Sequence, residues 1–135
     1  MTNIINGSCL CGAVTFKLKD EFDTFNICHC KQCQQMSGSA HMANLFTATD
    51  NIEWLSGEDQ IMTYDVPGRE IRNSFCKSCG CNLPYITISG RSLLVPSGSL
   101  ETEPVTTPEQ VIFWKERMSW YDDIHNVEKF DHWRK

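Results

Sequence analysis

Cysteine is the residue type in this chain whose number and spacing could support chemistry. The 135 residues contain eight cysteines in three groups: Cys9 and Cys11; Cys28, Cys30 and Cys33; and Cys76, Cys79 and Cys81. Thiols grouped in this way favour a metal site, whereas a disulfide framework would accompany an export signal. The first six residues have no cationic start and only two consecutive apolar residues. The sequence therefore predicts a cytoplasmic protein with reduced, metal-binding cysteines.

The first and last groups together have the pattern of a closed zinc site. Zn–S bonds of ~2.3 Å place the sulfurs of a tetrahedral thiolate site roughly 3.8 Å apart. Cys9 and Cys11 lie two residues apart, so in an extended segment both side chains share one face. Cys76 and Cys79 have the spacing of a tight turn around an ion, and Gly80 can take the positive φ that closes such a turn. We expect these four cysteines to hold one structural Zn²⁺.

The middle group indicates a second zinc with a different role. Cys28, Cys30 and Cys33 lie within six residues and could hold one ion without help from another segment. Three protein ligands leave the fourth coordination position free, as in catalytic zinc sites. The alternative is that Cys81 supplies a fourth thiolate and closes the site as a second structural centre. The sequence leaves these two interpretations open.

Two histidines accompany the middle group. His29 lies between two of the cysteines and should point away from their metal, so we expect a structural or hydrogen-bonding role. His41 follows a Ser-Gly-Ser-Ala turn and could act as an acid or base near the open metal position, although a packed or surface histidine is more common. The sequence assigns no catalytic residue beyond the metal centre itself.

The order and spacing of these motifs resemble one known family. The segments that carry the resemblance are Gly7–Val14, Cys28–Cys33, Ser37–Ser39, Phe75–Gly80, Ser97–Ser99 and Gln110–Trp120. Together they are similar to the glutathione-dependent formaldehyde-activating enzyme family, which also includes centromere protein V. The likeness runs from about Gly7 to Trp120, which is most of the chain.

The resemblance implies a fold, a set of ligands and an activity. The family fold is predominantly β, with small sheets around two zinc sites. Cys9, Cys11, Cys76 and Cys79 match its structural zinc ligands, and Cys28, Cys30 and Cys33 match the ligands of its catalytic zinc. The family is classed among the carbon–sulfur lyases and interconverts S-hydroxymethylglutathione with glutathione and formaldehyde. We therefore expect an enzyme that acts on a small thiol adduct, with the sulfur binding at the middle zinc.

One departure from the family bears on the substrate. Gln34 and Gln35 stand where family members often carry arginine, which implies weaker pairing with the carboxylates of glutathione. The main alternative function is a non-catalytic, zinc-stapled protein-binding module. A redox or zinc-buffering protein is a second alternative.

The elements that must position the cysteines are predicted to be short strands. Alternation of apolar and polar residues over 13–18 indicates a half-buried strand. Further strands are expected at 51–55, 61–66, 71–75, 85–88 and 93–95 and in the first half of 110–120, and helices only at 31–36 and 127–133. The sequence thus predicts one mainly β domain, residues 1–135, in which small sheets of short antiparallel strands are organised around two zinc sites.

Charge and hydropathy restrict the partners. The net charge is −5, and no basic run is longer than Arg134-Lys135. Nucleic acids and anionic membranes are therefore not expected as partners, because both need clustered cations. The longest aliphatic run, Leu93–Val95, is far too short for a transmembrane helix. The expected partner is a small thiol or thiol adduct such as glutathione, and the oligomeric state is left open.

Overall fold

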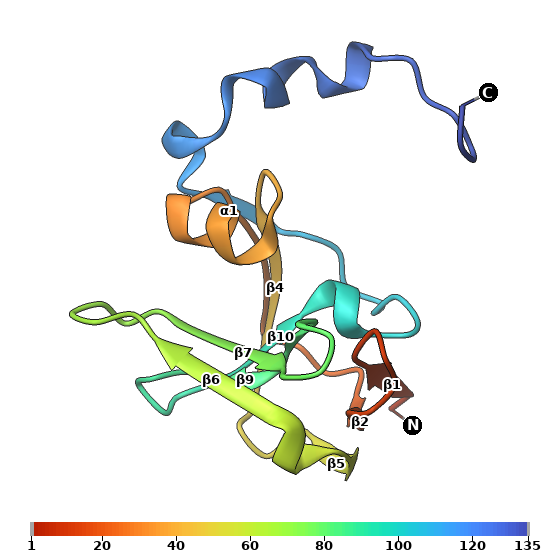
Figure 1. Cartoon of the computed structure of the whole chain (residues 1–135), viewed down its shortest axis with the longest axis vertical. Helices are drawn as coiled ribbons and strands as arrows, with labels where there is room; N and C mark the ends of the chain where they lie inside the picture. The colour runs from red at the N-terminus through yellow and green to blue at the C-terminus, as the bar shows by residue number, and fades with distance from the viewer. Residues whose placement is uncertain (1, 135) are drawn as a thin grey trace.

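Three small β-sheets organise residues 2–134, the part of the chain that this computed structural model describes (Figure 1). The central sheet has five strands in the order β11-β3-β4-β10-β9. Its strands are β3 (Thr24–Cys28), β4 (Met42–Thr47), β9 (Tyr85–Ile86), β10 (Leu93–Pro96) and β11 (Gln110–Ile112). Neighbouring strands are antiparallel except for β3 and β11, which run parallel.

Two further sheets contain three strands each. One has the order β1-β2-β5, and the other β6-β7-β8. Their strands are β1 (Ile4–Ser8), β2 (Thr15–Lys19), β5 (Glu53–Ser56), β6 (Ile61–Asp65), β7 (Arg72–Cys76) and β8 (Asn82–Leu83). All pairs in these two sheets are antiparallel. The prediction of a mainly β protein with small sheets is confirmed.

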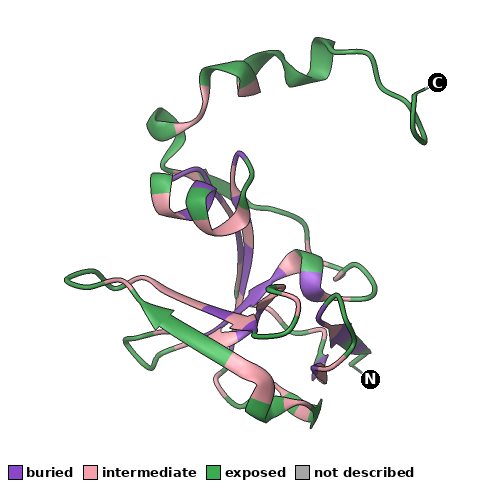
Figure 2. Cartoon of the chain, viewed as in Figure 1, coloured by how far each residue is buried: buried purple, intermediate pink, exposed green. Residues whose placement is uncertain are grey.

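The core forms where the apolar faces of the sheets meet. Phe16 and Leu18 on β2 are buried. The residues that alternate with them, Thr15 and Lys17, are partly exposed, as the predicted alternation requires. All four residues of β10 are buried, and Figure 2 shows buried residues concentrated on β4 and β10. A Cβ atom on Gly7 in β1 would overlap the ring of Phe16. Glycine is therefore needed where β1 lies against this ring.

Helical structure is limited to short segments. The helix predicted at 31–36 is present as α1 (Lys31–Ser37), which ends at Gly38 in the left-handed conformation. Single turns of 3-10 helix occur at η1 (Glu58–Gln60), η2 (Ser97–Ser99) and η3 (Trp114–Glu116), and a longer one forms η4 (Ser119–Asn126). Within residues 2–134, no helix is long and apolar enough to span a membrane.

The structure differs from the sequence prediction at the C-terminus and in the central sheet. The helix predicted at 127–133 is wrong, because that segment is irregular and each of its residues is exposed. So short a helix is unstable in water without a surface to pack on. The strands β1, β3, β4 and β8 were not predicted. In β4 both faces are partly covered, so Met42–Thr47 lacks the alternation that marks a half-exposed strand.

Candidate metal centres and the adjoining cavity

Four cysteines from two hairpins form the first candidate metal centre. The sulfur atoms of Cys9, Cys11, Cys76 and Cys79 all lie within 4.8 Å of one another. The Sγ–Sγ distance is 3.7 Å between Cys9 and Cys11 and 3.8 Å between Cys11 and Cys76. These distances match the roughly 3.8 Å between sulfurs of a tetrahedral zinc–thiolate site. The arrangement therefore fits a four-coordinate ion such as Zn²⁺.

Backbone amides hold these sulfurs in place. The Cys9 N–H donates to the Val14 carbonyl at 3.0 Å, and the Val14 N–H donates to the Cys9 sulfur at 3.3 Å. After Cys79 the chain turns at Gly80, whose φ of 77° confirms the predicted positive value. The backbone N–H groups of Cys81 and Cys11 point at the Cys79 sulfur and lower the pKa of that thiol to about 6. These donors favour the thiolate form of Cys79, which is the form that binds metal.

This four-cysteine group connects two different sheets. Cys9 and Cys11 follow β1, whereas Cys76 ends β7 and Cys79 lies in the turn between β7 and β8. A metal bound here would cross-link the β1-β2-β5 sheet to the β6-β7-β8 sheet. Such a closed site contributes folding energy and leaves no position for a substrate.

The second candidate centre joins the end of β3 to the start of α1. Cys28 is the last residue of β3, Cys30 is the N-cap of α1, and Cys33 lies in its first turn. All three side chains are buried, and their sulfurs lie within 4.8 Å of one another. Burial raises the pKa of the Cys28 and Cys33 thiols. A bound cation would have to displace these protons, so metal binding here would release protons.

Cys81 lies with the first centre and not with the second. Within residues 2–134, the group of mutually close metal-binding atoms around Cys28 contains only the three cysteines of the middle group. Cys81 packs beside Cys9 and Cys76, and its thiol donates to the carbonyl of Asn82 at 3.5 Å. This geometry favours the interpretation in which Cys81 is a spare thiol.

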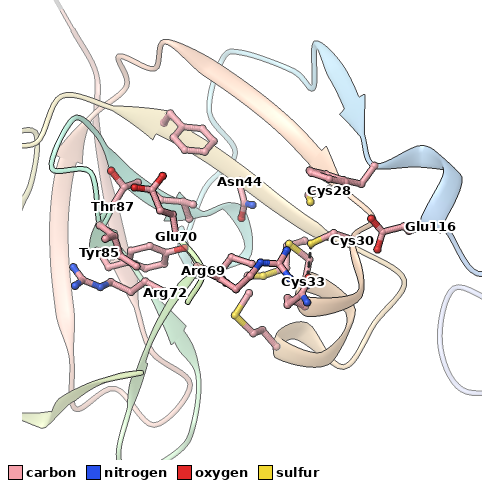
Figure 3. A pocket seen from close by; sticks show the side chains of 18 residues that line it. Cys28, Cys30, Cys33, Asn44, Arg69, Glu70, Arg72, Tyr85, Thr87 and Glu116 are labelled. Carbon is pink, nitrogen blue, oxygen red and sulfur yellow. Dashed lines mark hydrogen bonds between the residues drawn. The ribbon is translucent and has the colours of Figure 1, made fainter. Parts of the chain in front are cut away.

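A cavity of about 610 Å³ opens beside the three-cysteine group. Figure 3 shows Cys28, Cys30 and Cys33 at one end of this cavity and Arg72, Tyr85 and Thr87 at the other. Burial raises the pKa of Tyr85, so its phenol stays protonated at neutral pH and can donate a hydrogen bond. The cavity lies within the size range of small-molecule sites.

Asn44 lies on β4 between the two ends of the cavity (Figure 3). Its side chain is 8% exposed, and its Oδ1 has no hydrogen-bond partner among the described residues. Asn26, its register partner on β3, instead accepts a hydrogen bond from Gln110 at 2.8 Å. Buried amides are nearly always paired, so an unpaired one in a cavity wall indicates that a ligand or water completes it.

Charged residues line the cavity from the loop between β6 and β7 and from the start of β7. The Arg72 guanidinium is engaged by Asp65, at 2.6 and 2.9 Å, and by the carbonyl of Ile86. Arg69 and Glu70 also line the cavity, and within residues 2–134 their side chains form no hydrogen bond or ion pair. One unpaired cation and one unpaired anion are therefore available to a ligand.

Gln34 and Gln35 do not lie where the prediction of weaker glutathione binding requires them, and the weaker binding itself stays a prediction. Gln34 is buried, and its amide donates to the backbone carbonyls of His29 and Glu116 at 2.8 and 3.1 Å. Gln35 is exposed, and neither glutamine lines the cavity. The cationic residues of the cavity are Arg69 and Arg72, which lie more than 30 residues further along the chain. The local pattern after Cys33 could therefore not reveal them.

His29 and His41 belong to an aromatic cluster behind the three-cysteine group. The His29 ring is fully buried, with its centroid 5.1 Å from that of His41, 5.2 Å from Trp114 and 4.7 Å from Tyr121. Burial lowers the pKa of His29, and neither ring nitrogen has a partner among the described residues. This packing supports the structural alternative of the two roles predicted for His29. His41 does not line the cavity beside the cysteines, so the structure gives no support to acid–base catalysis by His41.

The end of β11 and the segment after it are hydrogen-bonded to the residues between the cysteines of the three-cysteine group. The His29 N–H donates to the Ile112 carbonyl at 3.1 Å, and the Lys31 N–H donates to Oε1 of Glu116 at 3.2 Å. Between these anchors lies Phe113, with φ of 54°, the one non-glycine residue with positive φ in residues 2–134. This conformation costs about 1–2 kcal/mol, and it occurs where Phe113 and Glu116 line the cavity.

Comparison with known proteins identifies the family. The family model for the glutathione-dependent formaldehyde-activating enzyme matches residues 4–116. The chain belongs to this family. Membership supports a formaldehyde-activating function in general. The region that matches the family model contains both cysteine centres and the cavity. Residues 117–135 lie outside the match.

A solved structure supports the fold of this family member. The crystal structure of a Rhodobacter sphaeroides protein superposes with a TM-score of 0.60 at 19% sequence identity. The match covers 78% of this chain and 98% of the other. At that identity the likeness establishes the fold alone. No curated protein matches the chain.

Proposed function

We propose that this protein is a zinc-dependent carbon–sulfur lyase that interconverts a hydroxymethyl thiol adduct with the free thiol and formaldehyde, with S-hydroxymethylglutathione as the favoured adduct. The observation that carries the proposal is the position of three buried thiols in the wall of a cavity of about 610 Å³. Family membership adds glutathione and formaldehyde as the expected chemistry.

The donor sets support two zinc ions per chain. The four thiols that include Cys9 and Cys76 suit a closed structural site, because sulfur separations of 3.7 and 3.8 Å suit tetrahedral zinc. Cys28, Cys30 and Cys33 would hold the second ion, which would supply a binding position for the substrate thiolate and stabilise negative charge on its sulfur.

The residues of the cavity suit the rest of glutathione. Its γ-glutamyl end carries an ammonium and a carboxylate, and its glycine end carries a second carboxylate. Arg69 can pair with a carboxylate and Glu70 with the ammonium, and neither has a partner within the described chain. The amide of Asn44, nearer the middle of the cavity, can bond to a peptide group or to the adduct hydroxyl.

The reaction breaks the O–H bond of the adduct hydroxyl and the carbon–sulfur bond. In the lytic direction the hydroxyl O–H loses its proton, the carbon–oxygen bond becomes a carbonyl, and the carbon–sulfur bond breaks with its electron pair on sulfur. The overall equation balances when glutathione leaves with that proton. Asn44 and Tyr85 would orient the adduct by hydrogen bonds, and neither exchanges a proton in this scheme.

Titration calorimetry with glutathione and S-methylglutathione tests the proposal. Wild-type, zinc-loaded protein should bind glutathione and release protons, and it should bind the S-methyl form much more weakly because that sulfur cannot ionise. The Cys30→Ser variant should lose this preference. Equal affinity for both compounds would show that the sulfur does not meet a metal. If no small thiol binds, the protein-binding module becomes the better explanation.

Arg69 offers a second test with a matched control. Arg69→Gln should weaken glutathione binding severalfold and leave the binding of 2-mercaptoethanol unchanged, because only glutathione has a carboxylate to pair. Arg91→Gln is the control, since Arg91 is exposed and does not line the cavity. Catalysis is followed by ¹³C NMR as the rate of exchange between formaldehyde and its thiol adduct. A wild-type rate equal to that without protein would contradict the proposed lyase activity.

A further inference from the structure

The C-terminal arm, residues 117–134, extends away from the three sheets. Figure 1 shows it leaving the sheet region beside α1, and Figure 2 shows most of it exposed. Its large apolar side chains are nevertheless numerous. Those that are half or nearly half exposed are Trp120 (51%), Ile124 (46%), Val127 (57%), Phe130 (52%) and Trp133 (94%). They recur every three or four residues, with polar residues between them.

The exposed surface of the whole chain is larger than its mass requires. The described structure exposes 8775 Å². A compact monomer of 15.5 kDa is expected to expose about 7,200 Å², so the excess is about 1,600 Å². If two chains each covered this excess, the area removed from water would reach the range of stable dimer interfaces, which starts at about 1,200 Å² in total. The exposed apolar side chains of the arm are the part of the described chain that such an interface would cover.

The first residues of the arm, 117–122, are held by contacts within the arm and with the body of the protein. Arg117 pairs with Asp122 through hydrogen bonds of 2.8 and 3.1 Å, and its guanidinium lies 4.2 Å from the centre of the Trp114 ring. Tyr121 packs against His29 and His41, with ring centroids 4.7 and 5.5 Å apart. These contacts fix where the arm leaves the body, so less conformational entropy is lost by its first residues, up to Asp122, when the arm packs on another surface.

The charge of the arm is compatible with a second copy of this chain as the partner. Residues 117–135 contain four Lys and Arg and four Asp and Glu, so the net charge of −5 belongs entirely to residues 1–116. A neutral arm can approach the acidic body of another copy without net repulsion. In a two-fold dimer each copy would give one arm and receive one, which closes the assembly.

We propose that the C-terminal arm packs against a second copy of this chain and forms a two-fold homodimer. The proposal does not depend on the zinc sites or on the lyase activity. It predicts that apolar residues far along the arm stabilise the dimer without contributing to the fold of the body. Val127, Phe130 and Trp133 meet this description, since all three are more than half exposed in the single chain.

Sedimentation velocity of the full-length, zinc-loaded protein over a concentration series tests the proposal. The wild type should sediment at twice the 15.5 kDa chain mass. The double variant Val127→Glu, Phe130→Glu should sediment as a monomer, and Trp133→Glu should shift the equilibrium the same way. Val105→Glu is the control, because Val105 is 80% exposed but lies outside the arm, and it should leave the dimer intact.

Zinc content and circular dichroism of the arm variants should equal those of the wild type, which distinguishes dissociation from misfolding. A wild type that stays monomeric at every concentration would overturn the proposal. So would a double variant that keeps the dimer mass. A heavier wild-type mass that Val105→Glu lowers as much as the arm variants do would place the contact elsewhere, and would also overturn it.

Discussion

Cys30 combines two roles in one side chain. Its sulfur belongs to the three-cysteine group, and it also accepts the backbone N–H of Cys33 at 3.4 Å as the N-cap of α1. A side chain at this position therefore affects both metal binding and the start of the helix. Serine separates the two roles, because its hydroxyl is a favourable N-cap but a poor zinc ligand.

We expect Cys30→Ser to remain folded and to hold about one zinc instead of two, since the four-cysteine group is untouched. Elemental analysis measures the metal, and circular dichroism measures the fold. Cys81→Ser is the matched control and should keep both ions, because Cys81 lies outside the three-cysteine group. Selective loss of one zinc from Cys81→Ser would contradict our division of the ligands.

Asn44 should contribute to substrate binding at the expense of stability. Its buried Oδ1 has no partner among the described residues, so Asn44→Ala should leave the free energy of unfolding unchanged or raise it. The same change should weaken glutathione binding roughly tenfold, the effect of one lost hydrogen bond of ~1.4 kcal/mol. Thermal unfolding and titration calorimetry measure the two quantities.

Asn26→Ala is the comparison for Asn44, because Asn26 is its register partner on β3 and is already bonded to Gln110. It should lower the stability by about 1–2 kcal/mol. It should not change the preference for glutathione over the S-methyl form. If Asn44→Ala destabilised the protein as much as Asn26→Ala and left glutathione affinity unchanged, Asn44 would have a purely structural role.

At the scale of elements, the hairpins β1-β2 and β7-β8 place the first centre, and the junction of β3 with α1 places the second. The hairpin β1-β2 depends on close packing, because Phe16 occupies the space above Gly7, its register partner on β1. Any side chain at position 7 would push the ring or the strand aside. The four-cysteine group follows directly at Cys9, so this packing also positions metal ligands.

Gly7→Ala should therefore destabilise the protein by about 1–3 kcal/mol, the usual cost of overpacking a core. Chemical denaturation of the zinc-loaded protein measures this value. Gly98→Ala is the control: a Cβ there would meet no atom within 4 Å, so its effect should be small. Equal effects of the two substitutions would show that the contact with Phe16 is unimportant.

At the scale of the whole molecule, the four-cysteine group is one link between two small sheets, beside the apolar core that they share. Cys9 and Cys76 are its most buried members, at 3% and 0% exposure. Sheets of three short strands are marginal by themselves. Structural zinc sites bind with roughly 10–16 kcal/mol in small domains, as much as the whole stability of a typical protein.

Loss of this site should accordingly unfold the protein. Cys76→Ser should lose solubility, whereas Cys30→Ser should stay soluble. Stepwise chelation of the wild type should release one zinc while the β-sheet signal is retained, and the second only as that signal is lost. Soluble, folded Cys76→Ser protein with one zinc ion would contradict this assignment.

Several features of this protein could be predicted from the sequence because they are local. Cys-x-Cys and Cys-x-x-Cys spacings bring sulfurs together within a few residues, so the grouping of Cys28, Cys30 and Cys33 needs no tertiary information. The alternation in β2 and the turn at Gly80 are local in the same sense. The family resemblance rests on these motifs, and the match over residues 4–116 confirms it.

Other features depend on segments that are far apart along the chain. Arg69 and Asn44 meet at one cavity only because β4 and the β6-β7 loop lie beside it, and no motif links them. Cys81 is two residues from Cys79, yet only the fold decides that it remains with the first centre. Apolar residues recur at a helical spacing in the arm, but from Val127 to Arg134 every residue is exposed, and this part of the arm is irregular. Local spacing is determined by covalent geometry, whereas long-range contacts depend on how the sheets pack.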